Sequence, residues 1–581
     1  METLLSTFRS KITQSIVKAF GGELSAEESV ADISPCAQEE FGHYQCNSAL
    51  RLSKLLKQNP RAIAQKIIDQ FDAKMCSKVE IAGPGFINFT LSAPFLSDQL
   101  QEQFQDKLLG ACPPKKKQKV IVEFSSPNIA KELHVGHIRS TIIGECLARL
   151  FEFLGQDVLR LNHVGDWGTQ FGMLITYMLE FAPEVLKGNE PTNLESLMNW
   201  YKASKKRFDE DPDFKLRSQK EVVRLQSGEK EAMHAWKLIC EVSRKGFQEI
   251  YDIMDVQLIE RGESFYNPQL KDVVEEFERK GLVSISDGAK CIYLDGFQNR
   301  EGEPLPLMIQ KSDGGYNYDT TDLAALRHRI QVEKADRIIV VVDLGQSLHF
   351  QMIFAAAEKI GWLDRSKVQV DHVGFGLVLG ADGKKFKTRS GDTEKLIDLL
   401  TEAVDKARQI VTERMPDAEK NEVENLAHAL GIGAVKYADL SSLRTKDYTF
   451  SYDKMLRFEG NTAVFLLYAY VRINGIKRKI QTDMNQIFSE GKIALEHPSE
   501  ISLGIHLRRF GESLDMVARD LLPNRLTDYL YELAEKFNAF FRDCRVVGSP
   551  EEASRLILCE LTARVLRQGL EILGLKTVER M

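Results

Sequence analysis

The chain has 581 residues, of which 43% are hydrophobic and 28% are charged, and its formal net charge is −7. This is enough apolar material for several cores, and the mildly acidic total argues against unselective coating of nucleic acid while leaving room for a local basic face. No apolar run approaches the roughly 18 residues of a membrane-spanning helix, and the N-terminus has no signal-peptide core. We therefore expect a soluble, cytoplasmic protein with no membrane partner.

Cysteines are spread along the whole chain. There are nine of them, and no two form a CxxC pair. An odd count with wide spacing predicts free thiols in a reducing compartment and no zinc site.

The N-terminal segment, residues 1–112, is predicted to form an α+β domain. Apolar residues recur at helical spacing from Leu4 to Phe20. Residues 80–91, EIAGPGFINFTL, are typical of a strand, a turn and a second strand. Two prolines and a run of lysines over residues 111–119 then predict a linker.

Residues 113–172 have the pattern of a βαβ unit. The buried run VIVEF (120–124) predicts a parallel strand, helical spacing continues from Val135 to about Gly155, and DVLRLN (157–162) predicts the next strand. Strand, helix and strand within about 40 residues need a crossover connection. We interpret this segment as the first half of a Rossmann-type parallel-sheet domain.

The second half of that sheet is predicted over residues 306–400. RIIVVVD (337–343) predicts a strand, residues 348–362 a helix, and VDHVGFGLVL (370–379) another strand that runs into a basic loop. Three other segments are expected to be helical: 173–305, a charge-rich, mostly helical insertion; 401–445, a connection; and 446–581, an all-α bundle. The predicted fold class is therefore multidomain α/β with a divided Rossmann sheet.

Two histidines flank Val135 and Gly136 where the first strand passes into its helix. A helix N-terminus has unpaired N–H groups and about half a positive charge, which favour anions. His134 and His137 can donate hydrogen bonds to phosphate oxygens, and Gly136 lets a ligand approach the backbone. The pattern predicts a nucleoside triphosphate site at the carboxyl edge of the sheet. The alternative is that the histidines only cap the helix.

A glycine-bounded basic loop, GKKFKTRSG (383–391), follows the last predicted strand. Its cations can neutralise charge that develops on a leaving pyrophosphate. The candidate catalytic cations are Lys384, Lys385, Lys387 and Arg389. A solvated basic loop is the simpler interpretation of this segment alone, but its place in the other half of the same sheet favours a functional role.

The sequence HVGH resembles the HIGH signature of class I aminoacyl-tRNA synthetases, and KFKTR resembles a degenerate KMSKS loop. Five longer segments are similar to arginyl-tRNA synthetases in particular: FGHYQCNSA (41–49), EFSSPNIAKELHVGHIRSTIIGE (123–145), NHVGDWGTQFG (162–172), RGESFYNP (261–268) and LRFEGNTAVFLLYAYVRI (456–473). The resemblance implies ATP as a substrate, and we expect Mg²⁺ to bridge its phosphates. The resemblance also implies ATP contacts from His134, Gly136, His137, Lys385 and Thr388.

Thr388 departs from the family pattern, because a full KMSKS signature has its second lysine there. Lys384, Lys385 or Arg389 must then supply the charge, and the sequence does not choose among them.

A pocket selective for arginine needs paired acceptors, because the guanidinium is planar and has five donors. The arginine ligands that the resemblance supports are Glu123, Asn128, Tyr318, Asp322 and Gln346. Four of these have a simpler alternative. For Glu123 it is an ion pair with Lys131, and for Tyr318 a place in the core. For Asp322 it is a helix-terminal carboxylate, and for Gln346 a turn residue. Asp166 and Trp167 either orient the pocket or contact the ligand. Such a pocket rejects analogues by about 10⁴ to 10⁵, so no editing domain is expected.

The C-terminal segment resembles the anticodon-binding bundle of the same family. Aromatic side chains stack on splayed bases and cations meet phosphates, which makes Tyr468, Arg472 and Tyr531 candidates for tRNA contacts. Met581 and the N-terminal Asn88 are further candidates that rest mainly on the resemblance. The alternative is that the aromatic residues belong to the core and the basic residues to a solvated face.

The resemblance implies an arginine–tRNA ligase that forms arginyl-adenylate from L-arginine and ATP and transfers the arginyl group to tRNA(Arg). It further implies a monomer that activates arginine only with tRNA bound. One alternative is a catalytically inactive paralogue that binds RNA or a protein partner. Another is a nucleotidyltransferase acting on a small metabolite, against which the long helical C-terminal segment argues.

Overall fold

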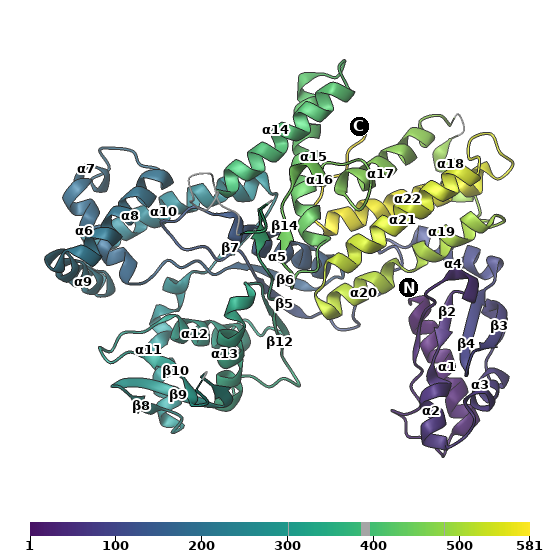
Figure 1. Ribbon diagram of the computed structural model, residues 1–581, viewed down its shortest axis with the longest axis horizontal. Helices are drawn as coiled ribbons and strands as arrows, with labels where there is room; N and C mark the ends of the chain where they lie inside the picture. Colours follow the sequence, from purple (N-terminus) through teal and green to yellow (C-terminus); the bar gives the residue numbers. More distant parts are fainter. Residues whose placement is uncertain (300, 381, 385–394, 481–482) are drawn as a thin grey trace. The chain divides into compact units, whose positions relative to one another are not determined.

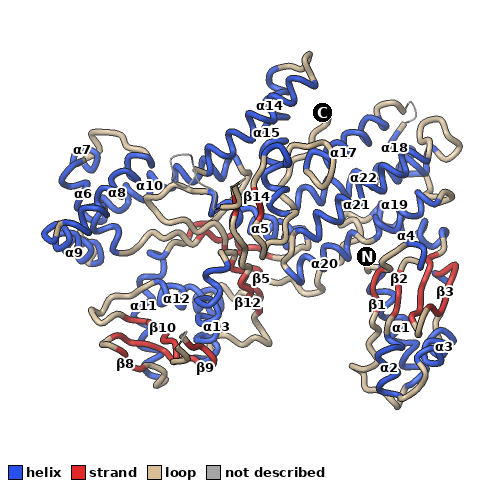
Figure 2. Tube along the Cα trace, viewed as in Figure 1, coloured by secondary structure: helices blue, strands red, loops and turns tan. Residues whose placement is uncertain are grey.

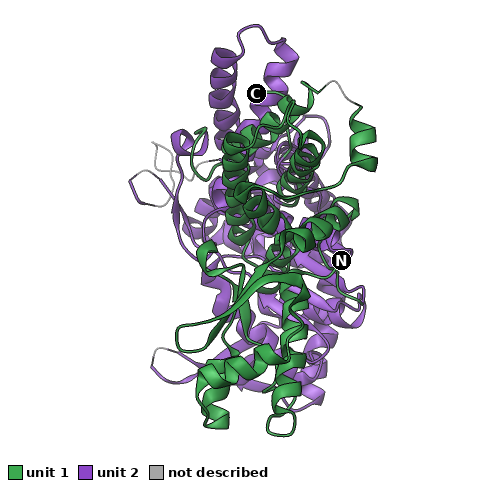
Figure 3. Ribbon diagram, turned by 90° about the vertical axis from the view of Figure 1, so that its right-hand side faces the viewer, with its two compact units in different colours: residues 1–115, 457–572, 576–581 green, residues 116–456, 573–575 purple. Residues whose placement is uncertain are grey.

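The computed structural model describes residues 1–299, 301–380, 382–384, 395–480 and 483–581. Lys385, Lys387, Thr388 and Arg389 lie outside these ranges. Figure 1 shows the elements in chain order and Figure 2 their secondary structure. The chain divides into two compact units, coloured in Figure 3: unit 1 is 1–115, 457–572 and 576–581, and unit 2 is 116–456 and 573–575.

The N-terminal part of unit 1 contains a four-stranded antiparallel sheet in the order β1-β2-β4-β3. Its strands are β1 (Ile33–Pro35), β2 (Tyr44–Cys46), β3 (Cys76–Ala82) and β4 (Phe86–Leu91), and its helices are α1 (Leu4–Phe20), α2 (Ser48–Leu56), α3 (Pro60–Asp69) and α4 (Ala93–Gln105). The predicted helix and the predicted strand pair are confirmed. The apolar face of α1 packs into one core with β4 through Phe8 and Phe89.

The C-terminal part of unit 1 is all-α, as predicted. Its helices are α17 (Ala463–Lys477), α18 (Met484–Glu490), α19 (Pro498–Arg508), α20 (Phe510–Asp520), α21 (Asn524–Asp543) and α22 (Glu552–Ile572). Glu512 of α20 joins this bundle to the N-terminal part, because its carboxylate accepts hydrogen bonds from the Tyr44 hydroxyl (2.7 Å) and the Leu5 amide (2.8 Å).

Unit 2 is built on a five-stranded sheet in the order β12-β11-β5-β6-β7, and every neighbouring pair is parallel. The strands are β5 (Lys119–Glu123), β6 (Asp157–Asn162), β7 (Ile259–Glu260), β11 (Arg337–Val340) and β12 (Gln369–His372). Helix α5 (Val135–Phe153) connects β5 to β6. Since β5 pairs directly with β11, the two sequence halves form one sheet, and the prediction of a divided parallel sheet is confirmed.

The predicted strand over 370–379 is wrong in its middle. Strand β12 ends at His372, and β13 (Val378–Leu379) pairs instead with β14 (Tyr448–Thr449). Gly376 separates the two, and a Cβ there would lie 2.7 Å from the Lys446 carbonyl carbon. Glycine thus allows the chain to leave the sheet and run beside residues 446–449.

The long insertion is mostly helical, with α6 (Thr169–Phe181), α7 (Pro183–Leu186), α8 (Leu194–Glu210), α9 (Pro212–Gln226), α10 (Lys230–Ile253) and α11 (Glu263–Arg279). An antiparallel sheet that the sequence did not reveal follows, with β8 (Ser284–Ser286), β9 (Ala289–Gln298) and β10 (Pro304–Gln310). Polar residues and a glycine interrupt the alternation of β9, and prolines mark β10 as an edge strand, which obscured the pattern.

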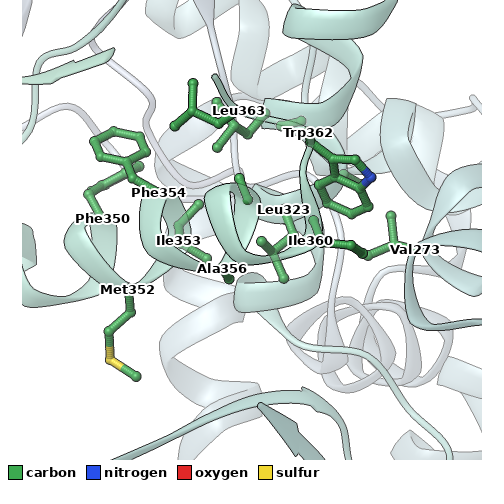
Figure 4. Packing of buried hydrophobic residues seen from close by; sticks show 14 of the residues in the cluster. Val273, Leu323, Phe350, Met352, Ile353, Phe354, Ala356, Ile360, Trp362 and Leu363 are labelled. Atoms are coloured by element: carbon green, nitrogen blue, oxygen red, sulfur yellow. The ribbon is translucent and has the colours of Figure 1, made fainter. Parts of the chain in front are cut away.

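A large apolar core fixes two helices, of which the first carries the predicted arginine ligands Tyr318 and Asp322 and the second starts directly after Gln346. These helices are α12 (Tyr318–Gln331) and α13 (Ser347–Ile360). Leu323 and Ile353 pack between them, with Trp362 and Val273 at one end of the cluster (Figure 4). The close packing of this core therefore fixes the position of α12 relative to α13, including the polar side chains that lie outside the core.

The remaining helices of unit 2 are α14 (Leu396–Arg414), α15 (Lys420–Leu440) and α16 (Tyr452–Met455). Over the part of the chain that the structure describes, no helix is long and apolar enough to cross a membrane.

Candidate active site

Later strands of the chain are added on both sides of β5, so the carboxyl end of β5 lies at a switch point of the parallel sheet. The chain proceeds from β5 to β6 on one side, and β11 lies on the other. Ligands of open parallel sheets bind in the crevice at such a point. Helix α5 starts there and packs closely on the strand, because Gly144 faces Phe124, whose ring carbon would lie 2.2 Å from a Cβ.

The histidine pair caps α5. His134 is the N-cap, and its Nδ1 accepts a hydrogen bond from the Gly136 amide (2.9 Å). His137 Nδ1 accepts one from the His134 amide (3.2 Å), and the ring centroids are 4.1 Å apart. Both histidines therefore cap the helix, and their contact with ATP stays a prediction. Since each Nδ1 accepts, each neutral ring carries its proton on Nε2, which is a donor for an anion.

Both imidazoles are neutral near pH 7. Burial lowers the pKa of His137 to about 3, with help from the neighbouring His134 and from Lys131. Burial and Lys131 also lower the pKa of His134. Removing a neutral donor's hydration costs less than removing that of a cation, so the pair can lie close to the sheet and still offer two N–H groups.

The segment after the basic loop lies beside His134. Lys395 forms an antiparallel bridge with His134, and its Nζ lies 3.0 Å from Glu132 Oε1. On the other side of the loop, the Gly380 amide donates to the Lys384 carbonyl (2.8 Å), and Lys384 itself is exposed. The chain that follows the basic loop thus lies beside the HVGH helix. This is expected if the two halves of the divided sheet come together.

A carboxylate cluster centres on His349, which the sequence did not single out. Its Nε2 lies 2.6 Å from Asp322 Oδ2 and its Nδ1 lies 3.2 Å from Asp319 Oδ1. His163, after β6, has Nε2 3.6 Å from Asp322 Oδ1. Burial alone would lower the pKa of His349, but the hydrogen bonds to both aspartates outweigh it and raise the pKa to about 9.

Two further carboxyl groups belong to this cluster. Burial raises the pKa of Glu263 to about 8, with contributions from Asp322 and Asp166. Asp166 is 1% exposed and accepts hydrogen bonds from the Ser264 amide (2.8 Å) and hydroxyl (2.6 Å) at the start of α11. Asp166 therefore holds a helix end in place, which favours the orienting role over ligand contact.

Three of the predicted arginine ligands, Tyr318, Gln346 and Asn128, are exposed, and Asp322 is partly buried. Tyr318 begins α12 and is 60% exposed, so it is not a core residue, and Asp322 follows one helical turn later. Gln346 is exposed and lies one turn before His349 at the start of α13. Asn128 is exposed and bridges Gly165, where any Cβ would lie 2.3 Å from the Asn128 Oδ1.

Glu123 is predicted to bind arginine, and its carboxylate is already paired within the protein. It is 4% exposed, and its Oε2 lies 2.5 Å from Arg329 Nη1, which is equally buried. The partner is not the local Lys131 of the simpler alternative. A substrate guanidinium at Glu123 has to share or displace Arg329, so this role stays a prediction.

The predicted tRNA residues fall into two groups. In α17, Arg472 lies over the ring of Tyr468 at 4.8 Å, and Tyr468 is 39% exposed, so this pair can meet a base and a phosphate. Asn88 is placed differently, since it is 3% exposed and its amide oxygen accepts from Gln45 Nε2 (2.8 Å). A tRNA contact there requires that amide to leave the sheet.

Tyr531 borders a pocket of about 800 Å³ in unit 1. Its ring packs on Phe465 at 5.4 Å. Carboxylates dominate the lining, which includes Glu39, Asp528, Glu532, Glu535 and Asp543 beside Lys536 and Arg542. Such surroundings disfavour phosphate, so a tRNA contact here is limited to stacking. Met581, at the chain end, is partly exposed.

No group of three or more His, Cys, Asp or Glu side chains is arranged to hold a metal ion within the described ranges. All nine cysteines are free.

Three residues of the cluster were missed from sequence, namely His163, His349 and Glu263. Each stands inside a segment already singled out, NHVGDWG, GQSLHF or RGESFYNP. A polar residue directly after a buried strand was the available signal for His163. His349 and Glu263 gave none, since their partners lie on other helices.

Three family models match most of the chain. Residues 99–452 match the class I tRNA synthetase (R) catalytic domain, 466–581 match the DALR anticodon binding domain, and 6–91 match the arginyl tRNA synthetase N terminal domain. The arginine–tRNA ligase of Protochlamydia amoebophila is 61% identical, and that of Nostoc sp. is 52% identical, each over 100% of both chains.

Solved structures agree. The arginyl-tRNA synthetase of Plasmodium falciparum aligns with a TM-score of 0.88 at 34% identity, over 100% of both chains. The Thermus thermophilus enzyme aligns with a TM-score of 0.77 at 24% identity, also over 100% of both chains, and supports the fold.

Proposed function

This chain belongs to the arginyl-tRNA synthetases, and we propose that its site catalyses ATP-dependent attachment of L-arginine to tRNA(Arg). The observation that carries the proposal is the bridge between His134 and Lys395. It joins the triphosphate-binding helix end in one half of the sheet to the segment that follows the cationic loop of the other half.

Adenylation needs no general base, because the nucleophile is already an anion. A carboxylate oxygen of arginine attacks the α-phosphorus of ATP, an O–P bond forms, and the bond to the β-phosphate oxygen breaks to release pyrophosphate. His134 and His137 donate Nε2–H groups to phosphate oxygens, and Lys384 with its neighbours offsets the charge of the leaving group. The work of the site is positioning and charge stabilisation.

Transfer completes the reaction. A terminal ribose hydroxyl of tRNA attacks the activated carbonyl, an ester forms, and AMP leaves. We propose that bound tRNA is required for the first step as well, in keeping with the family pattern. Tyr468 and Arg472 are its proposed contacts in the bundle.

Recognition of the guanidinium falls to the carboxylate cluster around Asp322. Tyr318 and Gln346 flank it, and Asn128 is proposed to bind the amino acid's carboxylate or amine. A guanidinium that pairs with buried acceptors is matched by no other standard side chain in charge and donor number. The inactive-paralogue alternative has no feature in its favour.

Mg²⁺ is proposed to arrive with ATP as a phosphate complex, since Mg²⁺ is usually held by substrate phosphates with few protein ligands. We also propose a monomer that works in a reducing, cytoplasmic setting, for which nine free cysteines are the support.

ATP–pyrophosphate exchange with purified full-length protein tests the function. We expect exchange with arginine and tRNA together, little with arginine alone, and none with lysine or glutamate. Exchange driven by another amino acid but not by arginine would overturn the assignment.

A further inference from the structure

His349 makes contacts that require both of its ring nitrogens to donate. Nε2 faces Asp322 Oδ2 at 2.6 Å, and Nδ1 faces Asp319 Oδ1 at 3.2 Å. A neutral imidazole has one N–H and can satisfy one of these acceptors, whereas an imidazolium satisfies both. The geometry therefore describes a cation seated between two carboxylates, and it lies where the guanidinium is proposed to bind.

The charged groups around His349 come from three other elements. Helix α12 supplies Asp319 and Asp322, and α11 supplies Glu263, whose carboxyl interacts with Asp322. The segment after β6 supplies His163, 3.6 Å from the second oxygen of Asp322. The ring of Tyr318 packs on His349 with centroids 5.1 Å apart. Negative charge dominates, so one cation is favoured here before substrate arrives.

We propose that His349 is a positioning residue of the arginine pocket, which holds Asp322 in place as an imidazolium and releases a proton when the guanidinium binds to Asp322. This inference rests on the proposed function. The proton leaves a ring nitrogen for the buffer, and no covalent bond other than N–H changes.

Like-charge repulsion drives the release. A guanidinium at Asp322 lies within a few ångströms of the His349 ring, and a nearby cation lowers the proton affinity of an imidazole. Hydrogen bonds to the two aspartates raise the pKa of free His349 to about 9, so the ring is protonated before binding at neutral pH. Because the free protein then binds more protons than the complex, affinity for arginine must rise as pH increases from 7 toward 9.

Calorimetric titration of the full chain with L-arginine at pH 7.5, in phosphate and in Tris, measures the protons released. We expect about 0.5 to 1 proton per arginine in the unmodified protein. His349→Gln should release clearly fewer and bind arginine about tenfold more weakly. His234→Gln, an exposed histidine of the same unit, is the matched control and should behave as the unmodified protein does.

Glu263 is a second group that can release a proton, since burial raises its pKa to about 8. The Glu263→Gln variant removes its contribution to the measured release. This variant should keep the share of the release that comes from His349. Equal release in His349→Gln and the unmodified protein would overturn the inference, as would complete loss in Glu263→Gln alone. Should His349→Gln not fold, Asp319→Asn removes one acceptor and should reduce the release.

Arginine-dependent pyrophosphate exchange by the unmodified protein decides the proposed function separately. If the unmodified protein catalyses arginine-dependent exchange but His349→Gln releases as many protons as the unmodified protein, only the role of His349 is rejected.

Discussion

Arg139 Nε lies 3.0 Å from Asp439 Oδ2, and both side chains are completely buried, at 1% and 0% exposure. Arg139 stands on α5 two residues after His137, and its Nη1 also donates to the Lys446 carbonyl (2.9 Å). Its guanidinium lies 5.1 Å from the ring of Tyr448 in β14, the partner of β13. Arg139 thus ties the HVGH helix to α15 through the ion pair. Its other two contacts tie the helix to residues 446–449, which include β14, the partner of the strand that precedes the basic loop.

Replacing Arg139 by Met should be strongly destabilising, because the carboxylate of Asp439 is left buried without its counter-charge. We expect a loss of about 3 to 5 kcal/mol, measured as a lower denaturation midpoint of the full chain. The control is Lys205→Met, which removes an exposed pair with Asp209 and should cost less than about 1 kcal/mol. Equal effects of the two substitutions would show that the buried pair has no special weight.

Asp322→Asn should damage arginine recognition more than any other step. A neutral amide loses the charge-assisted pairing to a guanidinium, which costs about 2 to 4 kcal/mol, or roughly 30- to 1000-fold in kcat/KM for arginine. KM for ATP should change little. Steady-state aminoacylation checks both constants, with Asp313→Asn as the control, since Asp313 is an exposed turn residue that caps the Gly315 amide. An unchanged KM for arginine in Asp322→Asn would remove this residue from the pocket.

His137→Ala should lower kcat by about 10², the usual effect of losing one preorganised donor. His134→Ala should do the same and also lower stability by about 1 kcal/mol, because the helix cap is lost with it. Single-turnover adenylate formation reports the first effect and thermal unfolding the second. Near-normal turnover in His137→Ala would take this residue out of the chemistry.

Sequence patterns predicted what depends on neighbours in the chain. The buried runs at 120–124 and 337–343 identified two strands that pair, and His134 with His137 marked the helix end between them. Contacts between distant segments had no such signal. Glu123 pairs with Arg329, 206 positions away, and nothing in the local pattern of either residue shows it. His349 and Asp322 meet only because an apolar core packs α12 against α13.

Acid should destabilise the protein through the histidine pair. The pKa of His137 is about 3 in the folded chain and near 6.5 when unfolded. Below pH 6.5 the His137 side chain is protonated in the unfolded chain but not in the folded chain. The free energy of unfolding therefore decreases as the pH falls from 6.5 toward 3. At pH 5 the loss is on the order of 1 to 2 kcal/mol. The unfolding midpoint should therefore decrease more between pH 7.5 and pH 5.0 in the unmodified protein than in His137→Gln. Equal decreases would contradict the low pKa assigned to His137.

Gly136→Ala separates catalytic geometry from stability. A Cβ at this position would lie 2.6 Å from His134 Cε1 and 2.8 Å from its Nδ1, so the imidazole must turn away and its Nε2–H leaves the phosphate. Alanine favours the helix by up to about 1 kcal/mol, but turning the ring away also breaks the His134 cap, which costs about 1 kcal/mol. Unfolding should therefore shift little while kcat falls about tenfold. Gly433→Ala on α15 is the matched control, because its Cβ would meet only Leu575 at 3.6 Å, an ordinary contact. If both alanine variants retained full turnover, the exact placement of the His134 ring would not matter for adenylate formation, and the role given to its Nε2–H would be lost.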